Sequence, residues 1–147
     1  MGGVPWFYFV EYQPDIELAL QALRKREFAA GRYHPVVKFP EFPVTTSSPA
    51  PGANHGSIEE ALGASREDGT RSVLDMKRVG KKPDYSVVTA LPAQRLRDLY
   101  GTDRPSRAMV EENMDFFEDI ERGHGIYIIV YQNDQPSELF FAGYSYD

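Results

Sequence analysis

The chain of 147 residues contains no cysteine. This absence excludes a disulfide framework, a zinc site built on thiolates and a cysteine nucleophile at the same time. The sequence also has no apolar run that is long enough for a membrane-spanning helix, and the apolar stretch 6–10 is too short for the core of a signal peptide. We therefore expect a cytoplasmic protein that does not contact a membrane.

Common catalytic and cofactor motifs are missing as well. There is no His-Glu-x-x-His pair, no Gly-x-Ser-x-Gly elbow, no phosphate-binding Gly-Lys-Ser/Thr loop and no dinucleotide fingerprint. We expect no cofactor. The missing motifs disfavour an enzymatic function but do not exclude it.

Acidic residues outnumber basic ones, 22 to 16. The formal net charge is -6, whereas a protein that binds nucleic acid needs a dominant basic footprint. One small basic cluster is present, for which a solvated surface is the simpler interpretation: Lys77, Arg78, Lys81 and Lys82. Nucleic acid is therefore not an expected partner.

A single domain spanning residues 1–147 is the simplest organisation for a chain of this length. Its least regular part is a long loop at residues 32–56. This loop cannot form a regular helix, because it contains the five prolines Pro35, Pro40, Pro43, Pro49 and Pro51. A loop of this length inside a domain is either functional or packs across the sheet.

Three helices are indicated by residues that favour helix ends. The first lies between Asp15 and Gly31, and the second begins at a capping box formed by Ser57 and Glu60. The third follows the Leu91-Pro92 pair and ends at Gly101.

A fourth, acidic helix is predicted over residues 102–123. Thr102 or Asp103 would cap its N-terminus, Pro105 would lie in the first turn, and Gly123 would end it. Six acidic residues against two arginines lie between residues 107 and 122. The helix would bury one apolar stripe formed by Val110, Met114, Phe117 and Ile120.

Five segments have the composition of strands. Residues 6–12 are rich in aromatics, and residues 126–131 and 139–144 form a predicted hairpin around the turn residues 132–136. Residues 70–76 and 85–90 are two further candidates. Because aromatic side chains favour cross-strand pairing, we expect the first strand to pair with the C-terminal hairpin.

These elements predict an α+β fold with a mainly antiparallel sheet of four or five strands and helices packed on one face. The apolar residues on both sides of the outer strands then require a cover for the second face. The proline-rich loop, a second copy of the chain in a homodimer, or a ligand could provide that cover.

The acidic helix face provides the first candidate site. A face of one charge sign favours association with a protein partner that has a basic surface, and the predicted contact residues are Glu111, Asp115, Glu118 and Asp119. The spacing of Glu111, Asp115 and Glu118 also suits a hard metal ion if other ligands converge on them. A solvated acidic face is the simpler interpretation, and we expect no metal.

The second candidate site is a pocket under the loop at residues 34–56. His55 precedes the capping box and would be the base, with Ser48 as nucleophile and Asp75 as the orienting acid. The spacing of the three residues does not itself support this arrangement.

The sequence therefore favours an interaction or regulatory module, of an inhibitor or immunity type, that uses its acidic helix face. The alternative is a small enzyme or ligand-binding domain whose pocket lies under the loop.

Overall fold

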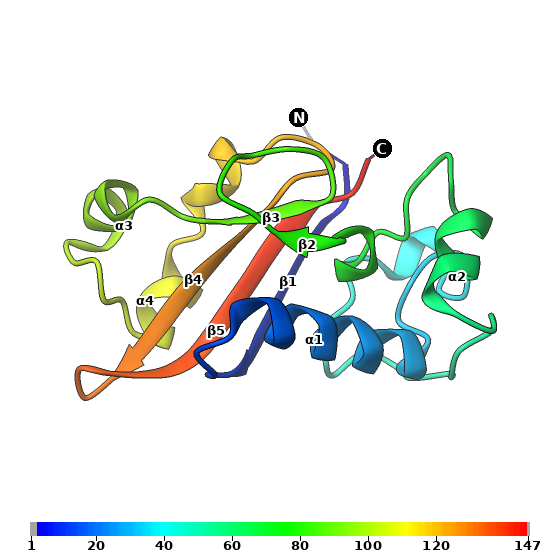
Figure 1. The fold of residues 1–147 in the computed structure, drawn as a ribbon, viewed down its shortest axis with the longest axis horizontal. Coiled ribbons are helices and arrows are strands. Elements are labelled where there is room, and N and C mark those ends of the chain that lie inside the picture. The colour runs from blue at the N-terminus through cyan, green and yellow to red at the C-terminus, as the bar shows by residue number, and fades with distance from the viewer. Residues whose placement is uncertain (1–2, 147) are drawn as a thin grey trace.

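The computed structural model describes residues 3–146 and contains one five-stranded mixed sheet with helical segments on both faces (Figure 1). The strands are β1 (Pro5–Glu11), β2 (Arg78–Val79), β3 (Val87–Ala90), β4 (Gly125–Gln132) and β5 (Gln135–Tyr144). The α-helices are α1 (Ile16–Ala30), α2 (Ile58–Ala64), α3 (Ala93–Tyr100) and α4 (Arg107–Glu112). Three short 3-10 helices are η1 (Phe39–Glu41), η2 (Val73–Asp75) and η3 (Asp115–Asp119).

The strand order in the sheet is β1-β5-β4-β3-β2. Strand β5 is antiparallel to both β1 and β4, whereas β3 is parallel to both β4 and β2. The prediction of a mainly antiparallel sheet was therefore wrong. For β3 and β4, the reason is the long crossover through α3, α4 and η3, which returns the chain to the sheet in the same direction.

The expected pairing of the first strand with the C-terminal hairpin is confirmed. The register of β1 and β5 runs from Pro5 opposite Tyr144 to Glu11 opposite Glu138, and the first and last strands lie side by side (Figure 1). The predicted hairpin of β4 and β5 is also present. Its two-residue turn uses Asn133 and Asp134, with φ values of 52° and 62°, as the tightest hairpin turns require.

The predicted strand 70–76 is instead a buried loop that contains η2. Asp75 Oδ1 accepts hydrogen bonds from the Thr70 backbone N–H (2.8 Å) and from the Thr70 hydroxyl (2.9 Å). Ser72 Oγ accepts from the Leu74 N–H. These local side-chain bonds satisfy backbone groups that a strand would have paired with a neighbour.

The predicted helix 102–123 was wrong as well. The chain forms the six-residue α4, which is capped by Ser106, and then the separate η3. Asn113 ends α4 in an extended conformation, with its side chain accepting from the Asp115 N–H (3.0 Å) and donating to the Leu99 carbonyl (3.3 Å). The acidic residues of this segment therefore do not share one helix face.

The other three helices are confirmed. Asp15 caps α1 by accepting from the Leu18 N–H, Ser57 caps α2, and Gly101 ends α3 in the left-handed conformation. Gly31 ends α1 with a φ of 75°, and the backbone of Gly52 leaves no room for a side chain there. Within residues 3–146, no helix combines the length and apolarity that a bilayer crossing needs.

Each face of the sheet has its own apolar core. Helix α1 packs on one face, where Trp6, Tyr8 and Phe141 are buried. On the other face, Val110 of α4 and Phe116 of η3 pack with the strand residue Phe140. The expectation of helices on one face only was therefore wrong, because the crossover segment between β3 and β4 covers the second face (Figure 1).

The loop at residues 32–56 contains only the short η1 as regular structure. It is anchored by the buried side chains of Tyr33, Val37 and Val44. Its last part reaches back to α1, since the Gly52 N–H donates to the Ala30 carbonyl (2.9 Å).

Candidate functional site

Strand β1 is an edge strand whose outer side is open. At the two ends of its pairing with β5, the Ser145 N–H donates to the Val4 carbonyl (2.9 Å) and the Tyr12 N–H donates to the Ser137 carbonyl (3.2 Å). Antiparallel strands alternate between residues that bond to the neighbour and residues that do not. The backbone N–H and C=O groups of Phe7 and Phe9 therefore point away from β5, and no residue between 3 and 146 pairs with them.

A groove of about 360 Å³ runs beside this open edge, and one of its walls comes from the long loop. That wall is a tight turn, in which the Ser48 N–H donates to the Thr45 carbonyl (3.0 Å) and the Thr45 N–H donates to Ser48 Oγ (2.9 Å). The groove is lined by Phe7, Tyr8, Phe9, Thr45, Thr46, Ser47, Arg107 and Glu111.

The opposite wall comes from α4. Ser106 caps this helix, which places Arg107 in the first turn and Glu111 one turn later. The Arg107 guanidinium lies 4.1 Å from the centre of the Phe9 ring. It also donates to Glu138 of β5 (2.7 Å) and forms an ion pair with Glu111 (3.6 Å).

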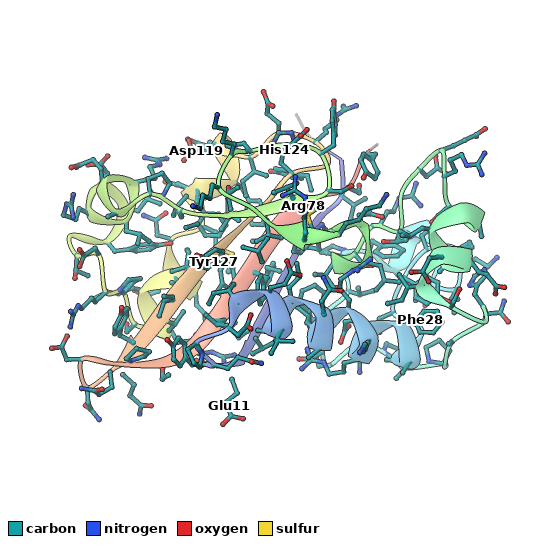
Figure 2. The ribbon with its side chains drawn as sticks, viewed as in Figure 1. Glu11, Phe28, Arg78, Asp119, His124 and Tyr127 are labelled. Atoms are coloured by element: carbon teal, nitrogen blue, oxygen red, sulfur yellow. The ribbon has the colours of Figure 1, made fainter. Side chains whose placement is uncertain are left out.

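The α4 side of the groove has a surplus of negative charge. Glu11 lies directly opposite Glu138 in the β1–β5 register, and both side chains are on the sheet face that carries Phe7 and Phe9. Glu11 is exposed and projects from the rim of the molecule (Figure 2). The guanidinium of Arg107 pairs with two carboxylates, those of Glu111 and Glu138, and Glu11 adds a third carboxylate opposite Glu138.

The predicted partner-binding residues are divided between two elements. Glu111 lies in the groove on α4, whereas Asp115, Glu118 and Asp119 belong to η3. Asp119 pairs with Arg95 of α3 (2.6 Å). Only Glu111 of the four lines the groove, because Asn113 breaks the chain direction between them.

The same break separates the three metal candidates. Glu111 is held by Arg107, while Asp115 and Glu118 are exposed on η3. A helical spacing of i, i+4 and i+7 no longer relates these residues, because they do not share a helix. Across residues 3–146, no group of three or more His, Asp and Glu side chains is arranged to hold a metal ion.

The three enzyme candidates have different partners. His55 Nδ1 lies 2.7 Å from the hydroxyl of Tyr33, Ser48 belongs to the turn at the groove wall, and Asp75 accepts from Thr70. Burial raises the pKa of Tyr33, and its hydroxyl shares with His55 Nδ1 a hydrogen bond whose direction is set by the tautomer of the imidazole. The bond therefore engages Nδ1 of the residue predicted to be the base, and its partner is a tyrosine and not Ser48 or Asp75.

A pocket of about 240 Å³ does exist in the long loop, and it is lined mainly by apolar residues. It includes Ser48 but neither His55 nor Asp75. Its volume is below the roughly 300–1,000 Å³ of most small-molecule sites. Its lining residues are Val36, Val37, Glu41, Val44, Ser48, Pro49 and Pro51.

The basic cluster lies where α1 meets β2. Gln21 of α1 donates to the Lys77 carbonyl (3.0 Å), and Glu17 of α1 accepts from the Val79 N–H (2.9 Å). The side chains of Lys77, Arg78, Lys81 and Lys82 are all exposed. The backbone of this segment thus joins a helix to the sheet, and its charged groups are solvated.

The edge groove combines unpaired peptide groups, hydroxyl groups and carboxylates in one place. Among its lining residues, Glu111 is the one that the sequence predicted to bind a protein partner. Phe7 and Phe9 were expected within a strand, but their role depends on β1 being an edge strand, which a single sequence does not show. No protein-family model, curated protein or solved structure matches the chain.

Proposed function

We propose that this protein is an interaction module that receives an extended segment of a partner protein along the open edge of β1. The observation that carries the proposal is the outward direction of the Phe7 and Phe9 peptide groups into a walled groove. An extended segment can add a strand to such an edge, with affinity from main-chain hydrogen bonds and specificity from alternate side chains.

Several features protect this edge from unspecific pairing. Exposed edge strands are a route to aggregation, and proteins commonly blunt them with proline, with charge or with a covering loop. Here Pro5 lacks a donor at one end of β1 and Glu11 places a charge at the other. The turn at residues 45–47 and helix α4 stand on either side. The groove thus favours one narrow segment over a second sheet.

This proposal keeps the protein partner that the sequence suggested but changes the surface that binds it. The sequence suggested a binding surface of four acidic residues on one continuous helix. The proposed binding surface is the edge of β1, and Glu111 lies in the groove wall beside it. An inhibitor or immunity type of module would act by covering an extended segment of its target, and a regulatory module would act by recruiting one.

The test uses a pair of substitutions at one position. Phe7→Pro and Phe7→Ala both remove the half-buried ring, but only Phe7→Pro removes the outward N–H, which β5 does not use. Random heptapeptides displayed on phage are first selected against the unmodified protein. We expect the selected peptides to bind Phe7→Pro about tenfold more weakly than Phe7→Ala, the size of one lost hydrogen bond.

Circular dichroism and melting temperature will show whether both variants are folded. Equal affinity of the selected peptides for the two folded variants would contradict the proposal, because it would place their binding away from the β1 edge.

A further inference from the structure

We infer that the segment bound by β1 carries lysine or arginine at alternate positions, and that these cations enter the acidic side of the groove beside Glu11 and Glu111. The inference rests on the proposed function. It adds the chemistry of the partner, which the open edge alone does not specify.

The alternation follows from strand geometry. Residues that lie opposite each other in neighbouring strands project to the same face of a sheet. Partner residues opposite Phe7, Phe9 and Glu11 must therefore project toward α4, where Arg107 and Glu111 lie. The residues between them project toward the hydroxyl-bearing turn at 45–47.

The preference for cations follows from the charges on the α4 side. Arg107 serves both Glu111 and Glu138, at 3.6 and 2.7 Å, so one guanidinium balances two carboxylates. Glu11, directly opposite Glu138, adds a third negative charge, and like charges opposite each other destabilise a strand pair. A lysine or arginine of the partner would balance Glu11 and relieve this repulsion.

Pro5 defines which part of the edge can be used. It has no N–H, so a ladder of bonds along the outer side of β1 has its donors at Phe7, Phe9 and Glu11. A bound segment is thereby centred toward the end of β1 where Glu11 lies.

The intervening positions face a neutral surface. Thr45, Thr46 and Ser47 contribute hydroxyl groups and no charge, so residues such as valine or threonine, which favour strands, fit there. A second copy of this chain fits less well, because it would bring the same three carboxylates and one guanidinium to the seam.

The probe is the synthetic heptapeptide Thr-Lys-Val-Lys-Val-Lys-Thr, with two analogues in which all lysines are replaced by glutamine or by glutamate. Binding to the full chain is measured by amide chemical shifts of Phe7 and Phe9, at roughly 20 mM and 300 mM salt, because salt screens exposed charges. At low salt we expect the lysine peptide to bind about three- to tenfold more tightly than the glutamine peptide, and the glutamate peptide to bind weakest.

Two double variants separate the groove from the overall charge. Glu11→Gln with Glu111→Gln removes the charge of Glu111 in the groove wall and that of Glu11 at the end of β1. Glu112→Gln with Glu121→Gln removes two exposed charges that belong neither to the groove lining nor to β1. Only the first pair should abolish the preference for lysine over glutamine. An equal effect of both pairs would overturn the inference, since the preference would then reflect net charge alone.

The remaining outcomes distinguish the inference from the proposed function. If the lysine and glutamine peptides shift the Phe7 and Phe9 amides with equal affinity, docking at the edge stands and the charge preference is overturned. If no peptide shifts these amides, both are overturned. If sedimentation shows a dimer of the free chain in which the same amides are protected from exchange, the edge belongs to a second copy and both are again overturned.

Discussion

The guanidinium of Arg107 lies 4.1 Å from the centre of the Phe9 ring, so a cation on α4 covers an aromatic residue of the edge strand. The same side chain reaches Glu138 on β5. Arg107 therefore connects three elements that are distant in sequence, and it fixes the distance between α4 and the open edge.

Replacing Arg107 with methionine should lower the free energy of unfolding by about 1 kcal/mol. The substitution removes the cation–π contact with Phe9 and the ion pairs with Glu111 and Glu138. Urea unfolding measures the loss. Adding Glu138→Gln to this variant should recover part of the lost stability, because it removes the carboxylate that no longer has Arg107 as its partner. The matched control is Arg104→Met, whose guanidinium lies farther from its ring, 5.4 Å from the centre of Tyr131, and this variant should lose less. An equal loss would contradict the role assigned to Arg107.

Amide hydrogen exchange in the free protein should alternate along β1. The N–H groups of Tyr8 and Val10 bond to β5 and should exchange slowly, whereas those of Phe7 and Phe9 point outward. We expect the outward amides to exchange roughly tenfold faster or more, since unpaired amides exchange without an opening event. Nuclear magnetic resonance resolves the four amides. Uniform protection would show that the edge is already occupied.

Two buried tyrosines should respond in opposite ways to removal of the hydroxyl. The Tyr8 hydroxyl is buried without a hydrogen-bond partner among residues 3–146. Burial, with Glu27 adding to it, raises its pKa; the nearby Val73 backbone acts in the opposite direction, but no bond of normal geometry joins them. Tyr8→Phe should therefore leave the free energy of unfolding unchanged or raise it, because an unpaired buried hydroxyl costs about 1–3 kcal/mol.

Tyr33→Phe is the matched substitution, and it should cost about 1 kcal/mol. Its hydroxyl lies 2.7 Å from His55 Nδ1 and also accepts from the Asn54 N–H. Thermal unfolding of the two variants under one condition compares them directly. A larger loss for Tyr8→Phe than for Tyr33→Phe would show that the Tyr8 hydroxyl has a partner.

Stability should fall at high pH partly through Tyr100. Burial, with Asp115 adding to it, raises the pKa of Tyr100 from 10.0 to about 12, and its hydroxyl donates to the Asn113 carbonyl (2.6 Å). The folded state therefore holds this proton more tightly than the unfolded state. The contribution is complete below pH 10.0 and is lost as the pH rises toward about 12.

Melting temperatures of the unmodified protein and of Tyr100→Phe, measured from neutral pH upward, check this expectation. The advantage of the unmodified protein should shrink across that window, while the other tyrosines titrate equally in both proteins. A difference that stays constant with pH would contradict it.

The parts of the fold that were predicted correctly are those governed by nearby residues. Helix α1 between Asp15 and Gly31 depends on caps that lie next to it, and the hairpin turn depends on two adjacent residues that tolerate positive φ. The prediction of one helix over residues 102–123 was wrong because two residues inside the segment favour helix ends. Ser106 begins α4 later than Thr102 or Asp103 would, and Asn113 ends it early.

The parts that were missed depend on segments far apart in sequence. The parallel pairing of β3 with β4 follows from a crossover whose path the strand residues themselves do not encode. The groove depends on β1 having a neighbour on one side only, and on a turn of the long loop arriving beside Phe7. Glu111 was identified because it is a charged residue on a capped helix, whereas Phe9 resembles any other strand aromatic.

The pairing of the first strand with the last one bears on how the protein is made. Within the described part of the chain, strand β1 has one hydrogen-bonded neighbour, which is β5, residues 135–144. During synthesis, the aromatic residues of β1 must therefore wait until residues 135–144 have been made before they can pair, and contacts of such long separation form slowly. The groove can exist only after β5 has joined β1, so a ribosome-bound chain that ends before β5 cannot yet engage a partner through this edge.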